Sequence, residues 1–216
     1  MIEATHIDHM GNDLSVVNAA RVSFGKKSEM EDDAWGPPKL KAKDAKLIRY
    51  LAKHKHISPF GHCFASFHVK APIFVARQLV KHKFLRWNEV SRRYVDDEPE
   101  FYVPYIWRGR SADKKQGSEG VAMTFVSDWD TYNHSLKIYK DLLEDGVAPE
   151  QARMVLPQST MTEWYWSGSL DAFADMCRLR CASDTQYETW VVADNINEKM
   201  ATLFPVSWAA LMQGDK

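Results

Sequence analysis

Residues 81–94, KHKFLRWNEVSRRY, hold the densest group of side chains that could bind or transform a ligand. Six of them carry or can acquire positive charge: Lys81, His82, Lys83, Arg86, Arg92 and Arg93. Because the whole chain has a formal net charge of -1, this cluster forms a local positive field in a neutral protein. Lysine, arginine, serine and free backbone N–H groups are what a phosphate needs. The segment therefore predicts a phosphate site, with a solvated basic turn as the alternative that composition leaves open.

Two further residues of this segment suggest how the ligand is held. Glu89 is a carboxylate among cations, which can accept from a sugar hydroxyl or orient an arginine. Ser91 has no histidine or aspartate arranged by the sequence to activate it as a nucleophile. We therefore expect Ser91 to bind phosphate.

The elements that position this segment can be read from the pattern of apolar residues. Helices are predicted from an N-cap at Asn12, over 45–54 and over 73–84, where Pro72 suits the first position. A strand is predicted over 63–71 because its apolar residues alternate. Beyond the basic segment, which itself looks turn-like, we expect a strand over 100–104 and another over 160–168. Helices are expected over 119–144, 148–156 and 170–204, ending near Gly146, Pro157 and Pro205.

This element order predicts an α+β fold, because helices dominate and the few strands are not in βαβ order. We expect one helix-rich catalytic domain over residues 1–216, built around a small, mostly antiparallel sheet. Two charged or polar segments, about 25–46 and 108–120, are expected to be mobile loops.

Bulk composition predicts a protein of the cytoplasm. The 216 residues are 45% hydrophobic and 26% charged, which is ordinary for a globular protein. The three cysteines, Cys63, Cys177 and Cys181, argue against a disulfide framework and for a reducing compartment. The N-terminus does not look like a signal peptide, and the most apolar run is too short to span a bilayer. We therefore expect neither a membrane nor a nucleic-acid partner.

The spacing of the basic segment resembles the signature of the flavin-dependent thymidylate synthases, Arg-His-Arg, seven residues and then Ser. Here the order is Lys81-His82-Lys83, seven residues and Ser91, with Asn88-Glu89 before the serine. Further blocks look like family blocks in the family order: MGNDLSVVNAARVSF, HVKAPIFVARQ, EFYVP, ARMVLP and a later segment RLRCASDTQYE.

The resemblance implies an enzyme, a methyltransferase that converts dUMP to dTMP. It implies FAD as cofactor, with 5,10-methylenetetrahydrofolate as the folate carbon donor and NADPH as reductant. It also implies a homotetramer of α+β subunits whose active sites lie between subunits.

The resemblance also assigns roles to residues of this chain. Those that look like the dUMP site are Gln78, Lys81, Glu89, Val90, Ser91, Arg92, Arg93, Arg153 and Arg180. Arg180 is expected to be the principal catalytic residue, because a guanidinium against the uracil would stabilise negative charge as C5 becomes nucleophilic. The alternative for Arg180 is a surface arginine paired with Asp184. Those that look like FAD contacts are Ser23, His56, Ser58, Lys81, His82, Lys83, Glu89, Ser169, Asp171 and Asp175.

Several positions depart from the family pattern, mostly on the flavin side. Lys81 and Lys83 stand where the family has arginines, so charge is kept and the bidentate fork is lost. Gly61 replaces a glutamate, and Arg92 replaces a small residue. The later flavin segment of the family usually carries asparagine and arginine, and here Ser169, Asp171 and Asp175 stand there. The two aspartates would put negative charge near a diphosphate. These changes leave room for an altered reaction, hydroxymethylation of a pyrimidine nucleotide.

Three other functions compete with this prediction. A metal hydrolase could use the histidines near residues 54–82, but no HExxH pattern or carboxylate cluster completes such a site, so no metal is expected. A nucleic-acid-binding module could use Phe84 and Trp87 as stacking platforms, which the near-neutral charge disfavours. A relative that binds dUMP without catalysis is the third.

Overall fold

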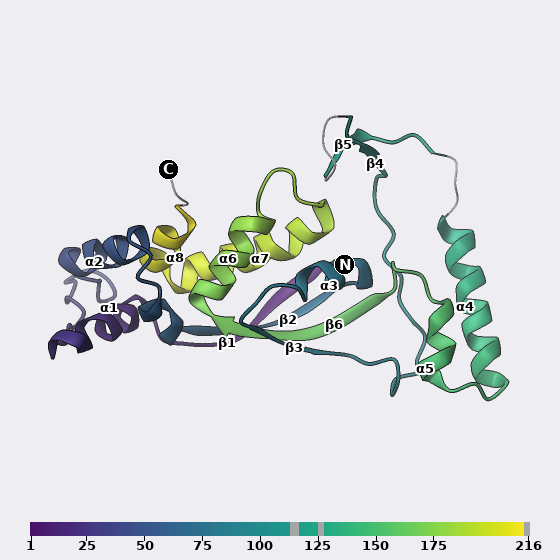
Figure 1. Cartoon of the computed structure of the whole chain (residues 1–216), viewed down its shortest axis with the longest axis horizontal. Helices are drawn as coiled ribbons and strands as arrows, with labels where there is room; N and C mark the ends of the chain where they lie inside the picture. Colours follow the sequence, from purple (N-terminus) through teal and green to yellow (C-terminus); the bar gives the residue numbers. More distant parts are fainter. Residues whose placement is uncertain (113–116, 125–127, 214–216) are drawn as a thin grey trace.

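A computed structural model describes residues 1–112, 117–124 and 128–213 (Figure 1). The elongated body consists of a central sheet with helices on one side and at one end. Its strands and helices are β1 (Glu3–Met10), α1 (Asp13–Arg21), η1 (Val22–Phe24), α2 (Ala42–Lys53), η2 (Ser58–His62), β2 (Phe64–Pro72), α3 (Ile73–Leu79), β3 (Leu85–Glu89), β6 (Met161–Ser169), α6 (Leu170–Arg180), α7 (Tyr187–Leu203) and α8 (Pro205–Met212). Among the described residues, no helix combines the length and apolar character needed to cross a membrane.

The central sheet has the strand order β1-β2-β6-β3, and every neighbouring pair is antiparallel. Phe67 of β2 lies opposite Trp166 of β6, and Leu85 of β3 lies opposite Gly168. The beginning of β3 therefore lies beside the end of β6, from which α6 continues. The α+β fold with a small antiparallel sheet is confirmed.

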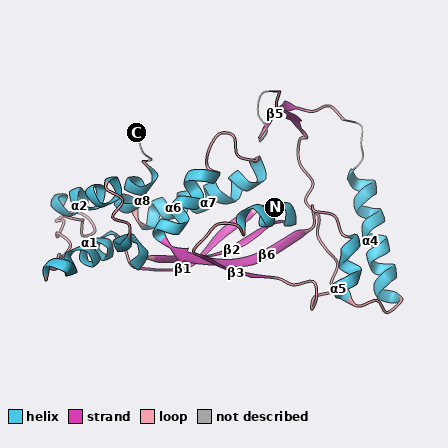
Figure 2. Cartoon of the chain, viewed as in Figure 1, coloured by secondary structure: helices cyan, strands magenta, loops and turns pink. Residues whose placement is uncertain are grey.

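The two faces of the sheet differ because side chains alternate along each strand. Phe67, Val69, Trp164 and Trp166 point to one face and are buried under α3, α6 and α7 (Figure 2). On the opposite face, Tyr165 is 51% exposed. In Figures 1 and 2, the helices of the body lie over the first face, and the second face stays open in the described chain.

A second part of the chain extends from the far end of the sheet (Figure 1). It consists of β4 (Arg108–Arg110) and β5 (Ser118–Val121), which pair antiparallel, and of α4 (Asp128–Glu144), α5 (Pro149–Ala152) and η3 (Arg153–Val155). One cavity forms where this extension returns to β3 and β6, and a second lies between the extension and α3.

Several predicted elements are confirmed. Asn12 caps α1 through a reciprocal capping box with Ser15. The predicted helix over 45–54 corresponds to α2, the alternating segments form β2 and β6, and the short helix over 148–156 ends before Pro157. Pro72 differs slightly, since it is the N-cap of α3.

Two predicted helices have the wrong extent. One leads into the basic segment, and the other lies in the extension. The helix over 73–84 ends at Leu79, and Phe84 then adopts a φ of 64° before β3 begins. β3 was predicted as a turn because it is a short polar edge strand. Within the predicted helix over 119–144, α4 is described from Asp128 onward, and Ser118–Val121 pairs with β4 instead. Residues 125–127 lie outside the described residues.

The remaining differences have local causes. The helix over 170–204 is two helices separated by residues 181–186, where Thr185 Oγ1 bonds the Leu179 carbonyl at 3.2 Å and competes with the helical pattern. The strand over 100–104 is reduced to one bridge, Phe101 to Thr160, between two prolines that lack N–H donors. β1 and α8 were not predicted at all.

The two segments predicted as loops contain regular structure at their margins. The first turn of α2 falls within 25–46, and β4 and most of β5 fall within 108–120. Residues 113–116 of the second segment lie outside the described residues. The mobility of both segments, and a single catalytic domain over 1–216, stay predictions.

Candidate active site

The residues predicted to bind dUMP fall into two groups at opposite ends of β3. The Arg180 group, which consists of Gln78, Lys81, His82 and Arg180, lies on α3, on the turn that leads into β3, and at the end of α6. The Glu89 pocket begins at the last residue of β3 and reaches Arg153 in the extension. β3 is five residues long, so its first and last Cα atoms lie about 13 Å apart.

The centre of the Arg180 group is a bond between Arg180 and His82. Arg180 Nε donates to His82 Nε2 at 3.1 Å. Burial and the Arg180 charge lower the pKa of His82 to about 4, and burial lowers the pKa of Arg180. His82 is therefore neutral near pH 7, and it accepts at Nε2 while its proton sits on Nδ1. The guanidinium is held through Nε, and no other described residue hydrogen-bonds its two terminal nitrogens, which leaves them for a ligand.

Gln78 is fixed by residues from the turn and helix that follow Arg180. Thr189 Oγ1 donates to Gln78 Oε1 at 3.3 Å, and Gln78 Nε2 donates to Gln186 Oε1. Gln186 in turn donates to Glu188 at 3.1 Å. This relay borders a cavity of about 570 Å³ whose walls include aromatic side chains: Phe74, Tyr102, Trp107 and Tyr132. Gln186 and Glu188 belong to the family block RLRCASDTQYE, in which sequence reasoning assigned a role only to Arg180.

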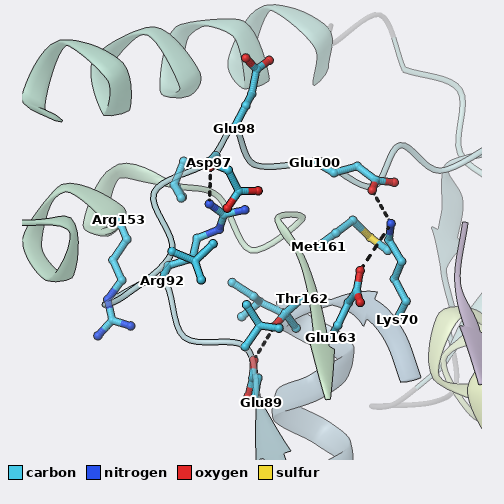
Figure 3. A pocket seen from close by; sticks show the side chains of 14 residues that line it. Lys70, Glu89, Arg92, Asp97, Glu98, Glu100, Arg153, Met161, Thr162 and Glu163 are labelled. Carbon is cyan, nitrogen blue, oxygen red and sulfur yellow. Dashed lines mark hydrogen bonds and ion pairs between the residues drawn. The ribbon is translucent and has the colours of Figure 1, made fainter. Parts of the chain in front are cut away.

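The Glu89 pocket is a cavity of about 600 Å³ at the junction of β3, β6 and the extension (Figure 3). Four of the predicted dUMP residues line it: Glu89, Val90, Arg92 and Arg153. The Arg92 guanidinium donates to the Asp97 carbonyl at 2.7 Å, which fastens the turn after β3. In place of the family's small residue, Arg92 therefore supports the pocket wall.

The other two predicted phosphate ligands lie close to this pocket. The Ser91 hydroxyl accepts from the Arg93 backbone N–H at 3.3 Å. Arg93 Nε lies 3.6 Å from the Glu150 carboxylate, and Arg153 Nε donates to the Glu150 carbonyl at 3.2 Å. Glu150 thus brings Arg93 and Arg153 to the same end of α5.

Carboxylates outnumber cations in the lining of the Glu89 pocket. The cations are Lys70, Arg92 and Arg153, and the carboxylates are Glu89, Asp97, Glu98, Glu100 and Glu163. Lys70 Nζ lies 2.6 Å from Glu100 and 3.7 Å from Glu163, and its hydrogen bond lowers the pKa of Glu100 (Figure 3). A phosphate in this pocket would therefore need positive charge from outside the pocket.

Comparison with known proteins places the chain in a family. The family described as "Thymidylate synthase complementing protein" matches residues 5–206. A flavin-dependent thymidylate synthase of Thermus thermophilus is 40% identical over 211 residues, which cover 94% of this chain and 73% of that protein. A flavin-dependent thymidylate synthase of Thermosipho africanus is 38% identical, and the match covers 96% of this chain and 89% of that protein.

The chain belongs to the flavin-dependent thymidylate synthase family.

A solved structure has the same fold as this member of the family. It is the UMP/dUMP methylase PolB from Streptomyces cacaoi bound with 5-Br dUMP, which superposes with a TM-score of 0.83 at 32% identity and covers 97% of this chain and 94% of that one. The same methylase bound with 5-Br UMP also superposes with a TM-score of 0.83, at 31% identity.

The residues that could hold the flavin of this family gather partly where α6 begins. Ser58 lies in η2, which packs against α6, and a Cβ added at Gly61 would lie 3.9 Å from Asp171 Oδ1. Asp171 Oδ1 is buried and has no hydrogen-bond partner among the described residues. Such an acceptor fits a ligand hydroxyl and does not fit a phosphate. Asp175 forms an ion pair with Arg178 instead.

The cationic turn of residues 81–84, which leads into β3, passes both ends of α6. A Cβ added at Gly168 would lie 3.1 Å from the Phe84 carbonyl oxygen, so the last residue of the turn lies beside the strand end that precedes α6. His82, two residues earlier, bonds Arg180 at the far end of α6.

As a buried acceptor, Asp171 fits a hydroxyl of FAD, and the exposed Lys81 and Lys83 fit its diphosphate. Ser23 in η1 and His56 before η2 are both exposed.

Proposed function

We propose that the chain catalyses the reductive methylation of dUMP to dTMP, with FAD as cofactor, 5,10-methylenetetrahydrofolate as carbon donor and NADPH as reductant. The observation that carries the proposal is Arg180, held by a neutral histidine beside Gln78 and Lys81 in a chain that matches thymidylate synthases over 94% of its length.

In this reaction the substrate's C5 must become nucleophilic. Arg180 would stabilise the charge that develops on the uracil, since its terminal nitrogens are not used by His82. Ser91, Arg93 and Arg153 would bind the phosphate, and Glu89 would accept from the sugar. FAD, when bound, supplies the reducing hydride. Asp171 and the 81–83 cations would hold it.

We further propose that each active site is completed between subunits of a homotetramer. The Arg180 group and the Glu89 pocket lie at opposite ends of β3, and carboxylates outnumber cations in the lining of the pocket. A second protomer that brings its Gln78, Lys81 and Arg180 to this pocket would supply the positive charge that a phosphate needs. The open face of the central sheet leaves surface for such contacts.

The proposed location is the cytoplasm. The three cysteines are free thiols, which favours a reducing compartment. Neither a nucleic acid nor a metal is part of the proposal. Among the described residues, no group of three His, Cys, Asp or Glu side chains is suited to hold a metal ion.

The proposal is tested with the purified protein and FAD. We expect a yellow protein that bleaches under NADPH without oxygen, releases tritium from C5-labelled dUMP and yields a product with the mass of dTMP. A hydroxymethyl product would instead support the altered reaction. A colourless protein that binds oligonucleotides in a salt-dependent manner, and not dUMP, would contradict the proposal. UMP is included as substrate because the similar Streptomyces protein is named a UMP/dUMP methylase.

A further inference from the structure

Glu89 is held in one orientation by two side chains. Thr162 Oγ1 donates to Glu89 Oε1 at 2.8 Å, and Trp87 Nε1 donates to Glu89 Oε2 at 3.0 Å. Each carboxylate oxygen therefore has one protein donor and keeps lone pairs for a further one. The first of these bonds points into the Glu89 pocket (Figure 3).

The two donors are themselves rigid. Thr162 is only 8% exposed and lies on the central strand β6. Trp87 and Glu89 are two residues apart on β3, so they share a face of the sheet. The Trp87 ring stacks on Trp164 with centroids 4.3 Å apart and planes at 18°. Because Trp164 is buried, this stack fixes where the Trp87 N–H points.

A fixed carboxylate that is open on one side suits a hydroxyl donor better than an anion. In dUMP the 5′ position carries the phosphate, so the 3′-hydroxyl is the single sugar donor. The neighbouring Ser91, Arg93 and Arg153 supply groups for the phosphate of the same ligand.

We propose that Thr162 and Trp87 are positioning residues that aim the Glu89 carboxylate at the 3′-hydroxyl of the nucleotide. This inference rests on the proposed function, because it takes dUMP as the ligand. Each of the two residues acts through Glu89. The predicted consequence is selectivity for a ligand with a 3′-hydroxyl.

The test compares dUMP with 2′,3′-dideoxy-UMP, which lacks that hydroxyl, by titrating the FAD-loaded protein. Thr162→Val keeps the side-chain shape and removes the donor, and we expect dUMP binding to weaken about 5- to 10-fold. Binding of the dideoxy nucleotide should change less than about twofold. Thr162→Ser keeps the hydroxyl and should therefore prefer dUMP over the dideoxy nucleotide as the unchanged protein does. Trp87→Phe should reduce this preference, as Thr162→Val does.

Two controls separate positioning from general damage. Thr202→Val removes a hydroxyl whose one partner among the described residues is the Glu198 carbonyl of its own helix. Both ligands should therefore bind this variant as they bind the unchanged protein. In a Glu89→Ala background, Thr162→Val should have no further effect on dUMP binding. If Thr162→Val does not fold, Trp87→Phe carries the same comparison.

Each outcome decides the inference. Equal weakening of both nucleotides, or unchanged dUMP binding in Thr162→Val and Trp87→Phe, would overturn the positioning role and leave the proposed function intact. A loss that persists in the Glu89→Ala background would overturn it as well. If the unchanged protein bound no dUMP and released no tritium from it, the proposed function and the inference would fail together.

Discussion

Arg180 and His82 form a hydrogen bond in which the arginine Nε donates to the histidine Nε2 at 3.1 Å. These residues are 98 positions apart, one at the end of α6 and the other in the turn before β3. Since Nε2 must accept, the bond exists only while His82 is neutral. The charge state of His82 thus controls the orientation of the proposed catalytic arginine.

Replacing Arg180 with alanine should abolish turnover while the fold is kept. Arg180 lies at the partly exposed end of α6, so truncation removes no core packing. Loss of a charge-stabilising donor costs about 100- to 1,000-fold in kcat. Tritium release from C5-labelled dUMP measures the effect, and the far-UV circular dichroism spectrum checks the fold. Near-normal turnover would refute the role.

Acidification should lower the free energy of unfolding through the protonation of His82. Its pKa in the folded protein is about 4, below the ordinary 6.5, so the unfolded chain takes up a proton that the folded one refuses. The His82 contribution to stability is therefore complete above pH 6.5 and is lost as the pH falls from 6.5 towards 4.

Thermal unfolding measured across this pH range tests the effect. In His82→Gln, whose amide oxygen can still accept from Arg180, the midpoint should fall less between pH 6.5 and 4 than in the unchanged protein. The exposed His54→Gln is the matched control and should follow the unchanged protein. Identical curves for all three proteins would contradict the assignment.

Replacing Lys81 with arginine should preserve or tighten the binding of dUMP or FAD. Lys81 is exposed next to His82, and arginine would restore the two-pronged donor of the family signature. Equilibrium titration of both ligands measures the change. A large loss of affinity would mean that the lysine serves a different geometry, and Lys53→Arg, at the exposed end of α2, controls for a general charge effect.

Sequence reasoning succeeded where the signal is local. Asn12 and Ser15 form a capping box within one turn, and the alternation in β2 and β6 reports burial on one face. It failed where pairing decides the structure. β3 is a polar edge strand whose conformation depends on β6, and nothing within residues 85–89 reveals that partner.

In the candidate site, too, local signals were predicted from the sequence and contacts that depend on strand pairing were not. The basic segment with Glu89 and Ser91 was identified from residue types and spacing, and Arg153 and Arg180 from resemblance. Thr162 was missed, because its contact with Glu89 crosses 73 positions of sequence through the unpredicted pairing of β3 with β6. The division of the dUMP residues between two ends of a strand also follows from that pairing.

Replacing Gly168 with alanine should destabilise the protein at the junction of β3, β6 and α6. An added Cβ would lie 2.4 Å from Leu85 Cδ2 and 3.1 Å from the Phe84 carbonyl oxygen. Leu85 can turn aside, but the backbone of the cationic turn must move, at a cost of about 1–3 kcal/mol. Denaturant unfolding measures this loss, and Gly36→Ala, which meets only the Asp33 side chain, should change stability little. Because the turn carries Lys81 and His82, Gly168→Ala should also weaken FAD binding, and unchanged stability together with unchanged FAD affinity would contradict the close approach.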